Sequence, residues 1–181
     1  MAKTRESCLI CQIVANNIPS YKVYEDEMAI AALDFNGANP GHCFIIPKNH
    51  YPILEQVPNE DLGHLFLVAN KVSSAIFESL RAQGTNIFVA NGIPAGQAVA
   101  HFMINVIPRK ENDNISLQWA TKQMSEEEMS TVELKLKENM QGVAGESPEK
   151  KEKHKAHAER PKPFISDDEE DYFMSQLRKI P

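Results

Sequence analysis

Apolar residues, many of them branched or aromatic, dominate the stretch that ends at Pro108 and predict a β-strand over residues 101–108. Side chains two residues apart share one face of a strand. We therefore expect one face to enter the core with Phe102, Ile104 and Val106. The opposite face collects the polar side chains of this stretch and consists of Gln97, Val99, His101, Met103, Asn105 and Ile107.

The rest of the chain divides into short strands, a helical turn after Cys8 and two longer helices. Further strands are predicted over residues 21–25, 28–34, 42–47 and 86–91. A long helix is predicted over residues 59–81, with Asn59 as its N-cap. Its buried stripe consists of Leu62, Leu65, Ala69, Val72, Ile76 and Leu80. A capping box at Ser125 predicts a second helix, with the apolar stripe Met129, Val132, Leu136, Met140 and Val143.

Composition and charge restrict the classes of partner. Of the 181 residues, 42% are hydrophobic and 24% are charged, which suits one globular domain with an extension. The net charge of −6 gives no basic surface for a nucleic acid, so we expect no nucleic-acid partner. No stretch is apolar enough to span a membrane or to act as a secretory segment. We expect a cytoplasmic protein that binds no membrane. The negative charge does not exclude small anionic ligands, because local backbone amides can hold a phosphate.

Cys8 and Cys11 form a Cys-x-x-Cys pair near the start of the chain. Such a pair is half of a metal site, a redox dithiol or simply two buried thiols. A redox pair normally follows a strand, and none is predicted before Cys8, so metal is favoured over redox chemistry. Three cysteines, with Cys43 as the third, argue against a disulfide framework.

The polar strand face resembles the defining motif of the histidine triad family, Gly-Gln-x-φ-x-His-φ-His-φ-His-φ-φ followed by Pro-Arg. The chain matches this motif on both sides of its centre, at Gly96, Gln97, Val99, His101, Val106, Ile107, Pro108 and Arg109. Met103 stands at the central histidine and Asn105 at the third. In the family, the central histidine attacks the α-phosphate of a nucleotide. A thioether cannot perform this step at neutral pH.

The resemblance implies an α+β fold with a mostly antiparallel five-stranded sheet, one long helix and a C-terminal helical extension. It also implies a two-fold homodimer. We expect a nucleotide-binding domain over residues 1–112, a segment with an amphipathic helix over residues 113–145, and a charged linker with a terminal helical element over residues 146–181.

The resemblance further assigns ligands to particular residues. Asp34 matches the aspartate that binds the ribose hydroxyls, while Asn91, Gly96 and Gln97 match residues that approach the phosphates. With Met103 and Asn105 they form the expected site for a purine nucleotide or nucleoside phosphate. In zinc-bearing relatives, two cysteines, a histidine after the third strand and the first triad histidine bind one structural zinc ion. Their counterparts here are Cys8, Cys11, His50 and His101.

Three functional hypotheses follow. The favoured one is a purine nucleotide-binding protein with structural zinc and weak or absent hydrolysis. The second is an active nucleotidyl hydrolase or transferase on dinucleoside polyphosphates or nucleoside phosphoramidates, with His42 or Asp34 as the base that activates water. The third is a zinc-stapled dimeric scaffold that binds a protein partner through its C-terminal tail. The hypotheses differ in whether the chain is an enzyme.

Overall fold

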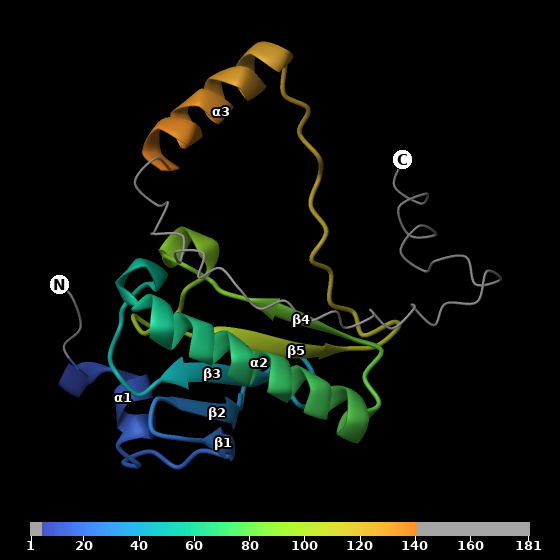
Figure 1. The fold of residues 1–181 in the computed structure, drawn as a ribbon. Helices are drawn as coiled ribbons and strands as arrows, with labels where there is room; N and C mark the ends of the chain where they lie inside the picture. The colour runs from blue at the N-terminus through green and yellow to red at the C-terminus, as the bar shows by residue number, and fades with distance from the viewer. Residues whose placement is uncertain (1–4, 141–181) are drawn as a thin grey trace, which may run out of the picture. The chain divides into compact units, whose positions relative to one another are not determined.

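The computed structural model describes residues 5–140, and its centre is one five-stranded sheet (Figure 1). The strands are β1 (Lys22–Glu25), β2 (Ala29–Leu33), β3 (Cys43–Pro47), β4 (Gly84–Phe88) and β5 (Ile104–Arg109). The helices and 3₁₀ turns are η1 (Arg5–Ser7), α1 (Leu9–Val14), η2 (Leu54–Gln56), α2 (Asn59–Leu80), η3 (Ile93–Ala95) and α3 (Glu126–Met140). The strand order is β1-β2-β3-β5-β4, and every pairing is antiparallel. The predicted α+β fold class is confirmed.

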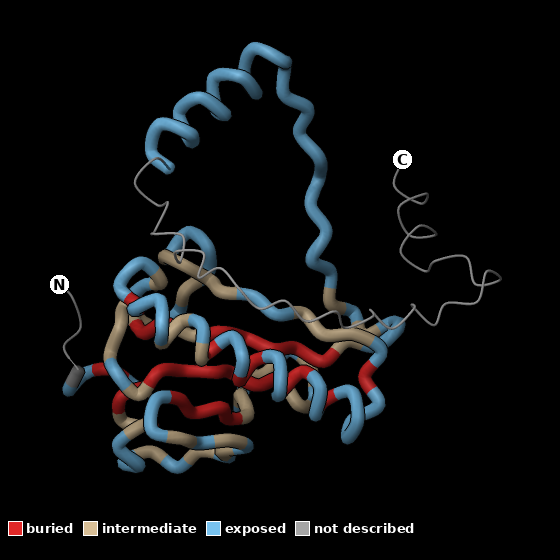
Figure 2. The backbone as a smooth tube through the Cα atoms, in the orientation of Figure 1, coloured by how far each residue is buried: buried red, intermediate tan, exposed pale blue. Residues whose placement is uncertain are grey.

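Burial is concentrated in the three middle strands (Figure 2). Strands β2, β3 and β5 are buried along almost their whole length, whereas the edge strands β1 and β4 are half-buried or exposed. The face covered by α2 contains Phe102, Ile104 and Val106, as the alternation predicts. The other face packs on α1 through an apolar cluster of Cys8, Ile10, Cys11, Ile13, Ile30, Ala32, Phe44 and Ile46. We call this set the α1 cluster.

Helix α2 occupies almost the predicted range. Its buried residues include Leu65, Ala69, Val72 and Ile76 from the predicted stripe, whereas Leu80 at its end is exposed. The N-cap position belongs to Pro58 rather than to Asn59, which is the first helical residue. The helix ends at Arg81 in the left-handed conformation, with φ of 51°.

Strands β4 and β5 are displaced from their predicted ranges. Strand β4 starts two residues early, and β5 starts only at Ile104 because the preceding backbone leaves the ladder. There the His101 amide donates to the Val99 carbonyl at 2.8 Å, and the Phe102 amide donates to Tyr51 at 2.6 Å. These bonds turn the chain where we predicted regular strand.

The chain divides into two compact units, Met1–Trp119 and Ala120–Pro181. In the second unit, the predicted capping box is present at the start of α3. The Ser125 amide donates to the Glu128 carboxylate at 2.8 Å, and the Glu128 amide donates to Ser125 Oγ at 3.3 Å. The predictions for Val143 and for residues 146–181 lie outside the described residues. No helix within residues 5–140 has the length and apolar character needed to cross a membrane.

Candidate functional site

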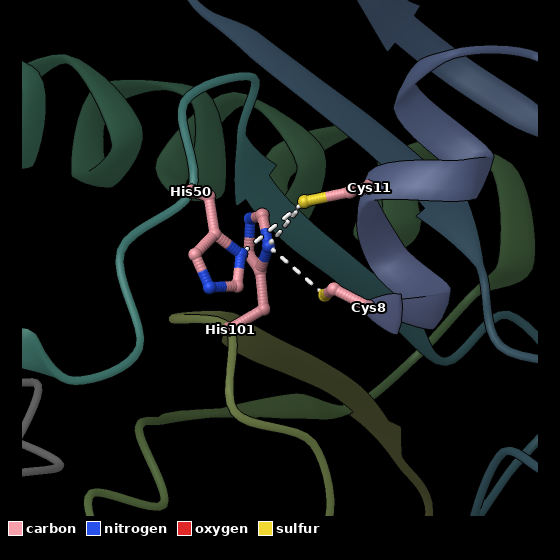
Figure 3. Close-up of side chains that lie close together, drawn as sticks. All are labelled: Cys8, Cys11, His50 and His101. Carbon is pink, nitrogen blue, oxygen red and sulfur yellow. Dashed lines mark hydrogen bonds between the residues drawn. The ribbon is translucent and has the colours of Figure 1, made fainter. Parts of the chain in front are cut away.

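Four potential metal ligands from three distant parts of the chain meet at one end of the sheet (Figure 3). Cys8 and Cys11 lie one helical turn apart at the start of α1, so both thiols face the same way. His50 follows β3, and His101 precedes β5. The four ligand atoms all lie within 4.8 Å of one another.

The spacing of these atoms fits a tetrahedral ion. Cys8 Sγ and Cys11 Sγ each lie 3.6 Å from His101 Nδ1, and Cys11 Sγ lies 3.2 Å from His50 Nδ1. In a tetrahedron with metal–sulfur bonds of about 2.3 Å and metal–nitrogen bonds of about 2.0 Å, sulfur and nitrogen ligands are about 3.5 Å apart. The predicted ligand set is therefore brought together, and it could hold a metal ion.

His101 has the protonation state that a metal ligand needs. Its side chain is fully buried, and this burial lowers its pKa to about 4, so the ring is neutral at physiological pH. Its Nε2 donates to the Pro47 carbonyl at 3.1 Å, which leaves the Nδ1 lone pair directed at the two thiols. His50 Nε2, by contrast, is buried without a hydrogen-bond partner among the described residues.

Met103 and Asn105 both lie on the sheet face opposite α2, but their surroundings differ. Met103 is half-buried and packs against the α1 cluster. Asn105 is 9% exposed, and its Oδ1 lies 3.2 Å from His42 Nε2. The sequence indicates His42 as a candidate base but does not predict this contact, because it joins residues 63 positions apart.

Asp34 lies at the end of β2 with one carboxylate oxygen available. Its Oδ1 accepts a hydrogen bond from the Asn36 amide at 2.8 Å, which closes a turn at the strand end. Its Oδ2 has no partner within residues 5–140. The carboxylate can therefore accept hydrogen bonds from a ligand.

The predicted phosphate-binding side chains are engaged in fixing two loops. Asn91 accepts from the Leu54 amide at 3.0 Å and donates to Glu55 at 2.8 Å. Gln97 accepts from the Gly92 amide and donates to the carbonyls of Pro52 and Val99. Gly96 has a φ of +90°, and no atom lies within 4 Å of where a Cβ would be. The Gly96 amide itself donates to the Ile93 carbonyl at 3.0 Å, so this loop offers open space beside Gly96 rather than a free amide there.

An exposed aromatic pair beside Asp34 was missed in the sequence. The rings of Tyr21 and Phe35 have centroids 5.5 Å apart, and the two residues are 66% and 69% exposed. Phe35 directly follows Asp34, so aromatic surface and a carboxylate occur together. Two aromatic residues fourteen positions apart carry no periodic signal that could have marked them.

The largely apolar cavity between α2 and β1–β3 is separate from these residues. It has a volume of about 410 Å³, and its wall includes Val23, Leu33, Cys43, Val72 and Ile76. None of the predicted ligand-binding or metal-binding residues lines it. This cavity is therefore not part of the candidate site.

Comparison with known proteins supports the likeness. The model of the family described as HIT domain matches residues 15–112. Adenylylsulfatase HINT3 of Arabidopsis thaliana is 37% identical over 120 residues, which are 66% of this chain and 59% of that protein. The chain thus matches less than two thirds of that relative. Protein hit of Bacillus subtilis is 37% identical over 117 residues, which are 64% of this chain and 81% of that protein.

Solved structures agree with the fold. A HIT family member from Bacillus subtilis has a TM-score of 0.69 at 31% identity, covering 72% of this chain and 95% of that one. A zinc-bound histidine triad protein from Mycobacterium smegmatis has a TM-score of 0.60 at 29% identity, with coverages of 77% and 99%. A histidine triad nucleotide-binding protein from Candida albicans has a TM-score of 0.68 at 27% identity, with coverages of 76% and 99%. This chain belongs to the HIT domain family.

Proposed function

We propose that the chain binds a purine nucleotide or nucleoside phosphate and hydrolyses it weakly or not at all. The observation that carries this proposal is Met103, which occupies the position of the nucleophilic histidine and packs on the α1 cluster. A thioether neither forms a phosphoramidate nor carries a proton at neutral pH. The residues around it keep groups that can hold a nucleotide. The proposal therefore retains nucleotide binding and loses hydrolysis.

The ribose and the base would be held near the end of β2. The free Oδ2 of Asp34 can accept hydrogen bonds from two ribose hydroxyls. The Tyr21 and Phe35 rings give a purine an aromatic surface to stack on, which is worth about 1–3 kcal/mol per base in nucleic-acid proteins. The phosphate would meet Asn105 and occupy the open space beside Gly96. The Asn91 and Gln97 side chains would hold the loops next to this space.

We further propose that the four-residue cluster binds zinc in a structural role. Two thiolates with two imidazoles match the softness and tetrahedral preference of Zn²⁺. All four positions are taken by protein ligands, which leaves no place for an activated water. The cluster would stabilise the junction of α1, β3 and β5. The reduced thiols also suit a cytoplasmic location.

The homodimer remains part of the proposal. Ser73 on α2 bonds Thr85 on the edge strand β4 at 2.7 Å, and Phe66 and Phe77 share that side of the helix. Both phenylalanines are 44% exposed, and Ile87 on the neighbouring strand is 42% exposed. An apolar helix side next to the free edge of β4 suits a second copy of the chain.

The experiment is a calorimetric titration of zinc-loaded protein with AMP and GMP. AMP is the first probe because one relative is named an adenylylsulfatase and another a nucleotide-binding protein. We expect saturable binding, and weaker binding by Asp34→Asn than by the control Glu27→Gln, which removes an acid without a ligand role. Absence of binding to every purine nucleotide while zinc stays bound would reject the proposal.

The second hypothesis, an active hydrolase, keeps one candidate base. Asp34 Oδ2 is available, whereas both ring nitrogens of His42 are engaged by protein groups. The third hypothesis, a scaffold acting through residues 146–181, stays a prediction because its key segment lies outside the described residues.

A further inference from the structure

His42 lies in a chain of hydrogen bonds that fixes which of its nitrogens carries the proton. The Ala38 amide donates to His42 Nδ1 at 3.1 Å, so Nδ1 must be an acceptor. A neutral imidazole then carries its proton on Nε2. This proton points to Asn105 Oδ1 at 3.2 Å, which makes the carbonyl oxygen of the amide the atom that faces His42.

The orientation of Asn105 follows from that contact. With Oδ1 bound to His42, the amide NH₂ points the other way. Asn105 Nδ2 has no partner within residues 5–140. His50 Nε2 is the single fully buried side-chain nitrogen or oxygen left unpaired in the described part of the chain. Asn105 Nδ2 is therefore not sealed from solvent, and it presents two free N–H donors.

The surroundings hold this arrangement in place. His42 and Asn105 are 8% and 9% exposed. The loop after β2 closes on the histidine, because the Asp34 amide donates to the His42 carbonyl at 2.9 Å and the His42 amide donates to Asn39 at 2.9 Å. A Cβ at Gly37 would lie 2.8 Å from His42 Cβ, so this loop has no room to shift inwards. Phe44 and Phe88 pair with Asn105 across the neighbouring strands.

We propose that His42 is a positioning residue that fixes the Asn105 amide as a permanent hydrogen-bond donor to an anionic oxygen of the ligand. This inference rests on the proposed nucleotide-binding function and assigns the phosphate, not the nucleoside, to Asn105. The amide flanked by two phenylalanines gives a neutral donor pair that suits a phosphate oxygen. Because both His42 nitrogens are occupied, His42 orients Asn105 and does not abstract a proton from water.

The loop of residues 34–42 contributes to both proposed contacts, with the ribose and with the phosphate. It begins with Asp34, the proposed ribose acceptor, and it supplies the Ala38 amide that sets the His42 proton. Binding of a ribose at Asp34 and of a phosphate at Asn105 would therefore favour one conformation of residues 34–42.

Two measurements on the full-length, zinc-loaded protein test the inference. The first is the nitrogen-15 NMR signature of the His42 ring at pH 7, assigned with His42→Gln. We expect a protonated Nε2 and an unprotonated Nδ1. A proton on Nδ1 would overturn the inference, and this result does not depend on whether any nucleotide binds.

The second measurement compares AMP with adenosine, which lacks the phosphate. Asn105→Asp keeps the side-chain shape and the acceptor for His42, but it replaces the outward donors with an oxygen. We expect it to weaken AMP binding by about tenfold or more and to leave adenosine binding unchanged. His42→Leu, which frees the Asn105 amide to turn, should show the same selective loss, and His42→Gln should restore part of it.

The outcomes separate this inference from the function on which it rests. If wild type binds AMP and Asn105→Asp changes AMP and adenosine binding equally, or neither, the role of Asn105 is wrong and the nucleotide site stands. If wild type binds neither compound, the proposed function fails, and the phosphate role of Asn105 fails with it.

Discussion

Under the proposed function, Met103 determines whether a bound phosphate is hydrolysed. The contacts of His101 and Asn105, its neighbours in the motif, require no proton transfer to a substrate. His101 is neutral, buried and directed at two thiols. Asn105 is bonded to His42. Under the proposed function, the three motif positions thus serve a metal site, apolar packing and a fixed amide, and none of them supplies a nucleophile.

Restoring the imidazole should restore some chemistry. We predict that Met103→His hydrolyses adenosine phosphoramidate roughly 10²-fold faster than wild type, because a positioned imidazole acts on that scale. Met103→Leu keeps the apolar volume and should stay as inactive as wild type. Product release followed by chromatography checks this. Equal rates in all three proteins would show that Met103 is not what limits the reaction.

Contacts between residues far apart in the sequence could not be predicted from the sequence. The four metal-binding candidates could be predicted because a local Cys-x-x-Cys pair and a known motif pointed to them. The His42–Asn105 and His64–Asp26 bonds join residues 63 and 38 positions apart, and no periodicity relates such pairs. Tyr21 and Phe35 were missed for the same reason. Hydrophobic spacing predicts which face is buried, but not which polar groups meet on it.

Among the elements, α2 was the easiest to predict and β5 the hardest. A long stripe such as Leu65, Ala69, Val72 and Ile76 repeats often enough to define a helix. The start of β5 depends instead on tertiary contacts, since His101 and Phe102 bond outside the ladder. The short helix α1, with six residues, is too short to be stable alone and depends on what it packs against.

A metal ion bound by Cys8, Cys11, His50 and His101 should therefore stabilise α1 more than any other helix. We predict that removing the metal with a chelator lowers Tm by more than about 10 °C, because metal binding contributes directly to folding free energy. Hydrogen exchange should rise first in Leu9–Val14 and only later in α2. Unchanged hydrogen exchange in α1 after metal loss would contradict a structural role of the metal at this helix.

Cys43 supplies a matched control for a second experiment, which measures the metal content of cysteine variants. Its thiol lies outside the cluster, and burial raises its pKa to about 11. Cys43→Ala should keep one metal ion per chain by elemental analysis, whereas Cys11→Ala should lose it. Equal metal content in the two variants would place the metal elsewhere.

The β1–β2 hairpin has its own anchor at Asp26. Burial alone would raise the pKa of this carboxyl, but four hydrogen bonds hold it far below its ordinary value. The donors are Tyr24, Ala29, Met28 and His64. His64, on α2, bonds Asp26 Oδ2 at 2.6 Å, so the carboxylate ties the hairpin to the helix.

The lowered pKa sets the direction of the pH dependence. A carboxyl with a folded pKa below its unfolded value stabilises the fold above about pH 4, and this contribution is lost as the pH falls further. We predict that Asp26→Asn lowers the free energy of unfolding by about 1–3 kcal/mol at pH 7 and by less at pH 3. Urea denaturation at both pH values checks this. Glu27→Gln is the control, and an equal loss from it would contradict the specific role of Asp26.

At the scale of the whole molecule, the proposed homodimer would cover the exposed apolar side of α2 beside β4. We predict that the wild type sediments as a dimer. Phe77→Glu should sediment as a monomer, because burying an unpaired charge at the interface is unfavourable by more than the apolar contact is favourable. Val23→Glu on the opposite sheet edge, where Val23 is 53% exposed, should stay dimeric. A monomeric wild type, or a monomer only for Val23→Glu, would place the interface elsewhere or remove it.

The most direct test of binding without turnover is a phosphorus NMR titration of adenosine phosphoramidate with the zinc-loaded protein. One spectrum reports both properties, since binding shifts or broadens the substrate signal and hydrolysis creates a separate AMP signal. We predict a saturable change in the substrate signal with no AMP formed above the rate without protein. Steady AMP formation by wild type would contradict the loss of catalysis at Met103, and an unchanged substrate signal would contradict the nucleotide site itself.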